Sequence, residues 1–380
     1  MRFPDEVPTL VDGDVTLRAH RVDDAAAIVE QCVDAVSIRW TTVPPGYDNA
    51  MAVEWVTEAI PAGWQSGSAR TFAIESTHPD GRRRFSGSLS LRDAGVDRAE
   101  LAFGAHPAVR GRGVMTSAVN LLLDYGFETC GIETVLWLAN VGNTASRRVA
   151  WKIGFTFGGV VPRWLPQRGE YVDGWVATLH RSDSRDPKCR WFDVPVIEAE
   201  RLRLRPLEER DTPRIVEASA DERSQHWLAF LPYPYTEQDA RDFILRSGTA
   251  AMEGTGLHWA VADAHTDVLL GTIGLPRGRH GSWEIGYCAH PSARGRGVMR
   301  EAVGLVTRHL FLDSAGGGIG ATRSFIRTAA GNSASQHVAV ANGYLHCGRE
   351  RQSEQLGDGS VTDVLLFDLL ASEWDPSVAS

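Results

Sequence analysis

Cysteine is scarce in this chain, and the cysteines lie far apart. The 380 residues contain five of them, at Cys32, Cys130, Cys189, Cys288 and Cys347. No two form a Cys-x-x-Cys pair, so the sequence predicts neither a disulfide framework nor a cysteine-rich zinc site. We therefore expect a protein without a metal centre.

Long apolar runs and an excess of positive charge are also missing. No run approaches the ~18–20 residues needed to cross a bilayer, and residues 1–6 lack the apolar core of a signal peptide. Asp and Glu total 48 against 39 Lys and Arg, a net charge of −9 that argues against a nucleic-acid binder held by phosphate contacts. The sequence predicts a cytoplasmic protein with neither nucleic acid nor membrane as a partner.

The chain repeats itself once. Residues 106–115 (His-Pro-Ala-Val-Arg-Gly-Arg-Gly-Val-Met) recur as residues 290–299, with eight of ten positions identical. Further matches before and after this segment keep offsets between 184 and 189 residues. That period is far too long for a solenoid unit and suits a whole domain. We expect an N-terminal domain at residues 1–183, a polar linker at 184–190 and a C-terminal domain at 191–380.

Each copy alternates between strand and helix patterns. Short strands open the copies at residues 15–18 and 202–205, and after each glycine-rich loop apolar residues recur every three to four positions, as in an amphipathic helix. A hairpin ends each copy, with turn residues at 172–175 and 357–360. The predicted fold class is α/β (α+β), with two tandem domains that each hold a mixed, mostly antiparallel sheet flanked by helices.

An Arg-Gly-Arg-Gly loop stands between a strand and a helix in both copies, at residues 110–113 and 294–297. Glycine removes side chains where a ligand must approach the backbone, and a helix N-terminus offers unpaired N–H groups and the positive end of its dipole. A pyrophosphate fits this arrangement, and a simple strand-to-helix turn is the alternative. The loop is neither a Walker loop nor a Gly-x-Gly-x-x-Gly dinucleotide loop.

The two loops resemble the acetyl-CoA pyrophosphate loop of the GNAT N-acetyltransferases. Residues 143–155 (Asn-Thr-Ala-Ser-Arg-Arg-Val-Ala-Trp-Lys-Ile-Gly-Phe) are similar to the Asn-x-x-Ser … Lys-x-Gly-Phe segment of the RimJ/RimL-like branch. The likeness covers nearly all of both copies. It implies acetyl transfer from acetyl-CoA to a primary amine of a peptide N-terminus, a protein or a small molecule.

The resemblance assigns acetyl-CoA binding to the loop and to the Asn of Asn-x-x-Ser. The implied cofactor-binding residues are Val109, Arg110, Gly111, Arg112, Gly113, Val114 and Asn143 in the first copy and Ala293, Arg294, Gly295, Arg296, Gly297, Val298 and Asn332 in the second. Two departures from the family pattern stand out. Met115 and Met299 replace the usual Gly or Ala, which could shift the cofactor, and residues 340–344 replace the Lys-x-Gly-Phe ending.

The resemblance also implies direct attack of an amine on the thioester, without an acyl-enzyme. The leaving thiolate must be protonated or stabilised by a nearby group, and the family pattern points to Ser146 and Ser335. Helix capping is the alternative role for these serines and for Asn143 and Asn332, because both residue types are common N-caps.

A base is needed because the attacking amine must be neutral, and a lysine side chain has a pKa of roughly 10.4 against roughly 7.7–8.0 for an α-amino group. Glu100 and Glu284, on the strands that lead to the loops, are candidates, although a solvent-facing glutamate is common on strands. Glu354 is a further candidate in the second copy, and the same alignment places Leu165 in the first. We therefore expect unequal copies, with the second the more active.

Other residues are expected to have structural or lining roles. His106 and His290 each precede a proline, which is more typical of a strand terminator than of a catalyst. The tryptophan-rich segments at residues 40–64 and 227–235 are expected to line the acceptor side, with core packing as the alternative, and Trp137 is expected in the core. The competing function is a non-catalytic or half-degenerate acetyl-CoA-binding or peptide-binding module. A monomer or a homodimer is expected.

Overall fold

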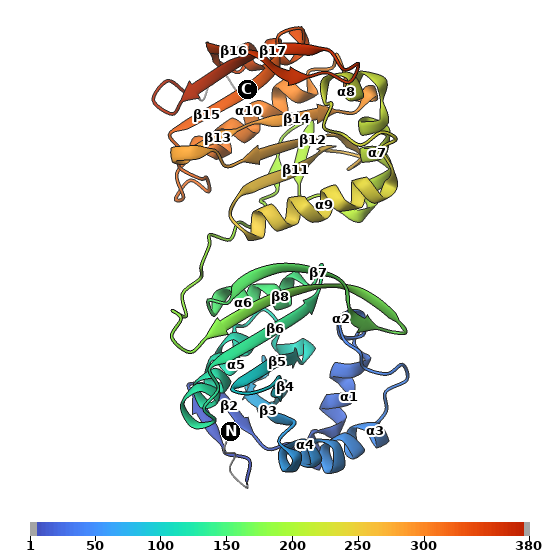
Figure 1. The fold of residues 1–380 in the computed structure, drawn as a ribbon, viewed down its shortest axis with the longest axis vertical. Coiled ribbons are helices and arrows are strands. Elements are labelled where there is room, and N and C mark those ends of the chain that lie inside the picture. The colour runs from blue at the N-terminus through green and yellow to red at the C-terminus, as the bar shows by residue number, and fades with distance from the viewer. Residues whose placement is uncertain (1–5, 376–380) are drawn as a thin grey trace. The chain divides into compact units, whose positions relative to one another are not determined.

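The computed structural model describes residues 6–375 as two compact units (Figure 1). The first unit runs up to Lys188 and the second starts at Cys189, so the division falls within residues 184–190. Residues 1–5, which hold most of the segment considered for a signal peptide, and residues 376–380 lie outside the described range. Each unit has its own buried apolar core.

The first unit is built on one eight-stranded sheet with helices on its faces (Figure 1). The strand order is β1-β2-β3-β4-β5-β6-β8-β7, and among these neighbours only β5 and β6 run parallel. The elements are β1 (Leu10–Asp12), β2 (Val15–Arg18), α1 (Ala25–Val33), α2 (Ala35–Trp40), α3 (Asn49–Glu54), α4 (Ile60–Ser66), β3 (Ala69–Thr77), β4 (Arg83–Asp93), β5 (Arg98–Ala105), α5 (Val114–Asp124), β6 (Thr134–Asn140), α6 (Thr144–Lys152), β7 (Thr156–Gln167) and β8 (Glu170–His180).

The second unit repeats this architecture, with its sheet divided in two. One part has the order β14-β12-β11-β10-β9 and the other the order β13-β15-β17-β16, in which β13 and β15 are parallel. The elements are β9 (Ile197–Glu198), β10 (Leu202–Arg205), α7 (Thr212–Ala220), α8 (Glu222–Trp227), α9 (Glu237–Met252), β11 (Gly256–Asp263), β12 (Leu269–Pro276), β13 (Ser282–Glu284), β14 (Gly286–Ala289), α10 (Val298–Phe311), β15 (Arg323–Ala329), α11 (Ser333–Ala341), β16 (Leu345–Gln355) and β17 (Val361–Leu370). The predicted fold class is confirmed.

A buried ion pair fixes the first strand of each unit to the helix that follows it. Arg18 of β2 donates two hydrogen bonds of 2.8 Å to Asp24, and Arg205 of β10 donates two of 2.8 Å to Asp211. All four side chains are no more than 7% exposed. Each Asp also accepts a backbone N–H, so the desolvated charges are fully used in hydrogen bonds.

The terminal hairpins of the two units have the same register, including their irregularities. Leu165 pairs with Val172 across β7 and β8, and Glu354 pairs with Thr362 across β16 and β17. Each hairpin has two register shifts at corresponding places. The structure therefore gives Leu165 and Glu354 equivalent positions, as the alignment predicts.

The turn expected at residues 172–175 is wrong, because this segment lies inside β8. The chain reverses at Arg168 and Gly169, which both have positive φ, at 51° and 88°. Two consecutive positive φ values match the twist of a tight hairpin. Gly174 is needed for packing: a Cβ there would lie 2.9 Å from the Cγ of Leu165. The second hairpin turns within residues 356–360, as predicted.

Candidate active sites

Two neighbouring strands diverge in each unit. In the first unit, β5 pairs with β6 only from Arg98 to Leu101, and its later residues pair with β4 alone. In the second unit, pairing with β15 ends at Glu284, and after Ile285 the chain joins β12 as β14. The glycine-rich loop follows one diverging strand and the Asn-x-x-Ser helix follows the other. The two predicted cofactor segments of each copy therefore begin on either side of the divergence.

The backbone of each glycine-rich loop is exposed and left-handed at its glycines. Gly111 and Gly113 have φ of 75° and 83°, and Gly295 and Gly297 have φ of 70° and 77°. No described atom lies within 4 Å of a Cβ built at any of them, so the backbone conformation is what requires glycine. No described side chain caps α5 or α10. Their first N–H groups are available to an anion.

Apolar side chains at both ends anchor the loops. Val109 and Ala293 before the loops and Val114 and Val298 after them are buried. Met115 and Met299 are also buried, and Met299 belongs to the core of the second unit. The departure from the family pattern at these methionines therefore adds bulk to the core and leaves the loop itself exposed.

The two arginines of each loop have different surroundings. Arg110 forms an ion pair of 2.7 Å with Asp34 and donates to Ser37, both at the start of α2. Arg294 pairs with Asp221 at 2.6 Å, at the start of α8. Their guanidinium groups thus tie the loop to the start of a short helix, α2 or α8. Arg112 and Arg296 are exposed, and neither forms an ion pair with any described residue.

His106 and His290 are built into the strand ends. Both are buried and accept a backbone N–H two residues later, at 3.3 Å for His106 and 3.2 Å for His290. The other ring nitrogen lies 3.2 Å from Glu30 in the first unit and 2.8 Å from Glu217 in the second. Burial lowers the pKa of His106, which favours its neutral form. This geometry indicates that the two histidines have a structural role at the ends of their strands.

The Asn-x-x-Ser segments form helix starts in which the asparagine is the cap. The side-chain oxygens of Asn143 and Asn332 each accept the backbone N–H three residues later, from Ser146 and Ser335, at 3.2 Å. The serines stand one turn inside the helix, so the capping alternative is correct for the asparagines and wrong for the serines. The serine hydroxyls remain available for other contacts.

The hydroxyls of the two serines have different partners. Trp137 of β6 donates its indole N–H to Ser146 Oγ at 3.2 Å, so this largely buried tryptophan contacts the site as well as the core. In the second unit, the hydroxyl of Tyr287 on β14 lies 2.9 Å from Ser335 Oγ and 3.2 Å from the Ser335 carbonyl oxygen. Burial raises the pKa of Tyr287 to about 12, which keeps the phenol protonated.

Two of the expected lining aromatics lie beside these helix starts. A Cβ built at Gly142 would lie 3.2 Å from the ring of Trp40, and one built at Gly331 would lie 3.2 Å from the ring of Trp227. Each glycine directly precedes the capping asparagine, so each tryptophan covers the approach to the Asn-x-x-Ser helix.

The far ends of the tryptophan-rich segments do not line a site. Trp64 packs edge-on against Phe72 and donates its indole N–H to the carbonyl of Thr71. Tyr235 is buried in a second apolar cluster of its unit. The lining prediction is therefore wrong for these two residues, because Trp64 on α4 and Tyr235 just before α9 both pack against apolar residues of their unit.

The hairpin tips close over the helices that bear Trp40 and Trp227. Gln167 donates to the carbonyls of Arg39 and Thr41 at 3.1 Å and 3.2 Å. Gly357 donates its backbone N–H to the carbonyl of His226 at 2.8 Å. In each unit, the end of the short helix and the tip of the hairpin are thus held together.

The candidate bases differ between the units. Glu100 forms a half-exposed ion pair of 3.3 Å with Arg92 on the neighbouring strand. Glu284 is less solvated, and burial raises its pKa, while Arg327 lowers it and the nearby charges of Glu354 and Glu350 raise it further. The charge of Glu354 therefore acts on Glu284, so these two predicted site residues influence each other electrostatically.

The equivalent surface of the first unit is apolar. The hairpin registers make Val161 equivalent to Glu350 and Leu165 equivalent to Glu354. The adjacent strands, β6 and β15, make Leu138 equivalent to Arg327. The guanidinium of Arg327 forms an ion pair of 2.6 Å with Glu350. Only the second unit, within the described residues, presents several charged groups at this place.

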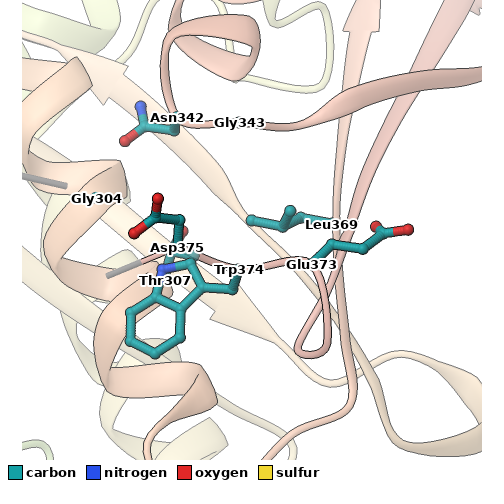
Figure 2. Close-up of a pocket in the computed structure, with 8 residues that line it drawn as sticks. All are labelled: Gly304, Thr307, Asn342, Gly343, Leu369, Glu373, Trp374 and Asp375. Carbon is teal, nitrogen blue, oxygen red and sulfur yellow. The ribbon is translucent and has the colours of Figure 1, made fainter. Parts of the chain in front are cut away.

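The second unit also contains a surface hollow and a small cavity. The hollow, of about 720 Å³, includes Phe325, Arg327 and Glu350 in its lining and is therefore continuous with the charged surface. The cavity, of about 50 Å³, lies between α10, the turn after α11 and the last described residues near Trp374 (Figure 2). Gly304 and Thr307 line it, about two turns or more beyond the glycine-rich loop, so it is separate from the candidate site.

A family model for the acetyltransferase (GNAT) domain matches the chain twice, over residues 14–156 and 201–345. The chain belongs to the GNAT acetyltransferase family. One match falls in each unit, which confirms the tandem arrangement and the predicted acetyltransferase. No curated protein sequence matches this GNAT chain.

Several solved structures are similar to one unit of this GNAT protein. Mycobacterium smegmatis RimJ in complex with CoA-disulfide is 22% identical, with a TM-score of 0.42 over 48% of this chain and 94% of that chain. A GNAT-family acetyltransferase from Bacillus anthracis is 16% identical, with a TM-score of 0.41 over 46% and 100%. The microcin C7 self-immunity acetyltransferase MccE in complex with acetyl-CoA and AMP is 19% identical, with a TM-score of 0.40 over 44% and 93%.

Within the described residues 6–375 of this GNAT protein, no three or more His, Cys, Asp and Glu side chains form a group that could hold a metal ion. No helix within the same range is long and apolar enough to cross a membrane.

Sequence reasoning missed three sets of contacts in the site. They are the Tyr287 hydroxyl on Ser335, the Arg327–Glu350 ion pair and the aspartates that hold the first arginine of each loop. The repeat itself carried one signal: Phe103 of the first copy aligns with Tyr287 of the second. A difference of one hydroxyl within matched strands marks a position where the copies diverge in chemistry.

Proposed function

We propose that this acetyltransferase transfers the acetyl group of acetyl-CoA directly to a primary amine of a peptide, a protein or a small molecule. One observation supports this most. In both units, an exposed glycine-rich loop at an uncapped helix start and an Asn-capped serine helix begin at the two strands that diverge. The loop's N–H groups suit a pyrophosphate, and the serine suits the thioester end of the same molecule.

The cofactor-binding roles of the loop residues follow from this proposal. The backbone N–H groups of residues 111–114 and 295–298 hold the pyrophosphate, and the exposed Arg112 and Arg296 add positive charge. Arg110 and Arg294 act through their backbone, because their side chains are paired with aspartates. Asn143 and Asn332 fix the start of the serine helix beside the thioester.

The reaction proceeds by direct attack of the neutral amine on the thioester carbon. The C–N bond forms and the C–S bond breaks. The amine gives up a proton to a carboxylate, directly or through a water molecule, and the thiolate receives the proton of Ser146 or Ser335. Burial raises the pKa of Cys32 to about 11 and also raises that of Cys288, so both stay protonated, which supports direct attack over an acyl-enzyme.

The second unit carries the larger share of the activity in this proposal. The charge of Glu354 acts on Glu284 there, and the raised pKa of Glu284 brings its basicity closer to that of an amine. The acidic surface suits an acceptor with positive charge. The first unit has Glu100 paired with Arg92, and it has apolar Leu138, Val161 and Leu165 where the second unit has Arg327, Glu350 and Glu354. A half-degenerate enzyme, whose first unit binds acetyl-CoA without turnover, is the second candidate that this difference favours.

Separate disruption of the two loops tests the proposal. Gly113→Glu and Gly297→Glu each place a carboxylate at a helix start, where it repels the pyrophosphate. Gly81→Glu and Gly317→Glu are matched controls, because both glycines are exposed, have positive φ and have no described neighbour within 4 Å of a built Cβ.

The readouts are calorimetric titration with acetyl-CoA and mass spectrometry of an amine and peptide panel. The unaltered chain should bind two acetyl-CoA molecules, and each loop variant should bind one. Gly297→Glu should abolish most transfer and Gly113→Glu should have a modest effect. No acetylated product from any amine, or the reverse order of the two losses, would contradict the proposal.

A further inference from the structure

The hydroxyl of Tyr287 is the only described side-chain partner of Ser335 Oγ. The two oxygens lie 2.9 Å apart, and the tyrosine oxygen also lies 3.2 Å from the Ser335 carbonyl oxygen. Tyr287 stands on β14 and Ser335 in the first turn of α11, so this contact joins the two sides of the strand divergence. Two segments that are 48 residues apart in sequence thus share one hydrogen-bonded pair at the candidate site.

A phenol in this place can do what an indole cannot. The hydroxyl has one hydrogen and two lone pairs, so it either accepts from Ser335 or donates to it. When the Tyr287 hydroxyl donates to the Ser335 carbonyl oxygen, its oxygen accepts a hydrogen bond from the Ser335 hydroxyl. With its proton on Ser335 Oγ, it frees the serine proton for another acceptor and stabilises the charge that this transfer leaves on the serine oxygen.

The first unit lacks this device. Phe103 stands at the position of Tyr287 and has no hydroxyl. Ser146 Oγ accepts from the indole N–H of Trp137, which orients the serine but has no acceptor capacity and no acidic proton. The second unit in turn has the buried Ile326 at the position of Trp137. The two units therefore hold their serines from different strands and with groups of different acidity.

We propose that Tyr287 is a positioning residue of the second unit, which holds Ser335 and returns the proton that Ser335 gives to the leaving thiolate. This inference rests on the proposed acetyl transfer. As the C–S bond breaks, the Ser335 proton moves to sulfur and the Tyr287 proton moves to Ser335 Oγ. The phenolate then takes a proton from water, and the carboxylate that accepted the amine proton releases it to water. The net change is one proton from the amine to the thiol.

The burial of Tyr287 supports this role. A protonated phenol is required at the start of each turnover, and burial raises the pKa of Tyr287 to about 12. The same burial disfavours the phenolate, so this anion is reprotonated before the next turnover. A phenolate is also a much weaker base than a serine alkoxide, so the relay ends on the more stable anion.

The test uses the full chain with Gly113→Glu as parent, so that the second unit alone transfers acetyl groups. Tyr287→Phe should lower kcat by about 10-fold or more, with the KM for acetyl-CoA unchanged within about twofold and the calorimetric affinity retained. Tyr344→Phe is the matched control and should leave kcat unchanged. It removes another buried tyrosine hydroxyl, one that bonds Thr307 and Ser324 beside the cavity of Figure 2.

Two further readouts separate proton relay from simple packing. The first is kcat measured in mixtures of light and heavy water and plotted against the deuterium fraction of the solvent. The plot for the parent should be curved, as expected when two protons move in the same step. The plot for Tyr287→Phe should be a straight line, as expected when one proton moves. Tyr287→Phe added to Ser335→Ala should cause no additional loss, because the tyrosine acts through the serine.

The outcomes distinguish this inference from the proposed function. A parent that transfers no acetyl group overturns both. A parent that transfers, with unchanged kcat in Tyr287→Phe or with losses that simply multiply in the double variant, overturns the role of Tyr287 alone. If Tyr287→Phe fails to fold, the dependence of the parent's kcat on the deuterium fraction decides. A straight line for the parent would contradict the relay.

Discussion

Leu165 and Glu354 occupy the same position in the two hairpins: Leu165 lies opposite Val172 and Glu354 lies opposite Thr362. Glu354 is close enough to Glu284 for its charge to raise the pKa of that residue. The first unit has only one of these two carboxylates, at Glu100. A duplicated scaffold therefore carries two different sets of groups around its candidate acceptor site.

The first prediction concerns Glu354. In the Gly113→Glu chain, Glu354→Gln should lower kcat/KM for amine transfer by roughly 10- to 1,000-fold, because an amide cannot accept the amine proton. The same substitution in the Gly297→Glu chain should have no effect on the residual activity of the first unit. Steady-state kinetics of both chains provide the check. An equal loss in both backgrounds would show that Glu354 acts on overall stability and not on transfer.

The second prediction concerns the serines. Ser335→Ala should lower turnover by roughly 10- to 1,000-fold, the range expected for loss of a proton donor, while acetyl-CoA affinity stays nearly intact. Ser146→Ala should reduce only the activity that remains in the Gly297→Glu chain. Turnover and calorimetric affinity are measured side by side. Full activity in both variants, alone and combined, would leave the serines with a purely structural role.

The third prediction is a pH dependence set by Glu284. Burial raises the pKa of this carboxyl, and a base must be ionised to accept a proton. The kcat/KM of the second unit should therefore fall about tenfold per pH unit below this raised pKa. Glu284→Gln should lower the activity and remove this acidic limb, and Glu100→Gln should leave the limb unchanged. Persistence of the limb in Glu284→Gln would assign it to another group.

The fourth prediction concerns stability. Asp24→Asn removes one of the two carboxylates paired with the buried Arg18, leaving only Glu75, and should destabilise the first unit by about 3 kcal/mol. Arg18 holds the pKa of Asp24 below its usual value against the opposing effect of burial. The stabilisation is thus present above the unfolded pKa of about 3.9 and is lost as the pH falls through the lower folded value. Denaturant unfolding at several pH values tests this, with the exposed Asp80→Asn as a control that should change little.

The sequence predicted those features that depend on local pattern. The repeat defined two domains, and apolar periodicity located the helices after the loops. The sequence also located the glycines of the loop, which it explained by ligand approach to the backbone, whereas the structure shows that their left-handed conformation requires glycine. The equivalence of Leu165 and Glu354 also followed from the alignment, and the strand registers agree with it.

The sequence did not reveal contacts that depend on side chains from distant segments. Asp-Gly at residues 173–174 has the composition of a turn, yet Gly174 is a strand residue that makes room for Leu165. Ser335 could be singled out, but its partner Tyr287 lies on another strand, and no spacing rule connects them. Trp64 and Trp40 stand in one tryptophan-rich segment, and only the packing of their helices separates a core residue from a residue beside the site.

The pairing of Arg110 with Asp34 has a consequence for the order in which substrates bind. Asp34 caps α2, and the last residue of this helix, Trp40, covers Gly142 before the serine helix. One short helix thus contacts the glycine-rich loop at its start and Gly142 at its end. Arg294, Asp221 and Trp227 repeat the arrangement. Under the proposed function, we therefore expect acetyl-CoA in the loop to steady the helix whose tryptophan lies on the approach of the amine, so that the acyl donor binds before the amine.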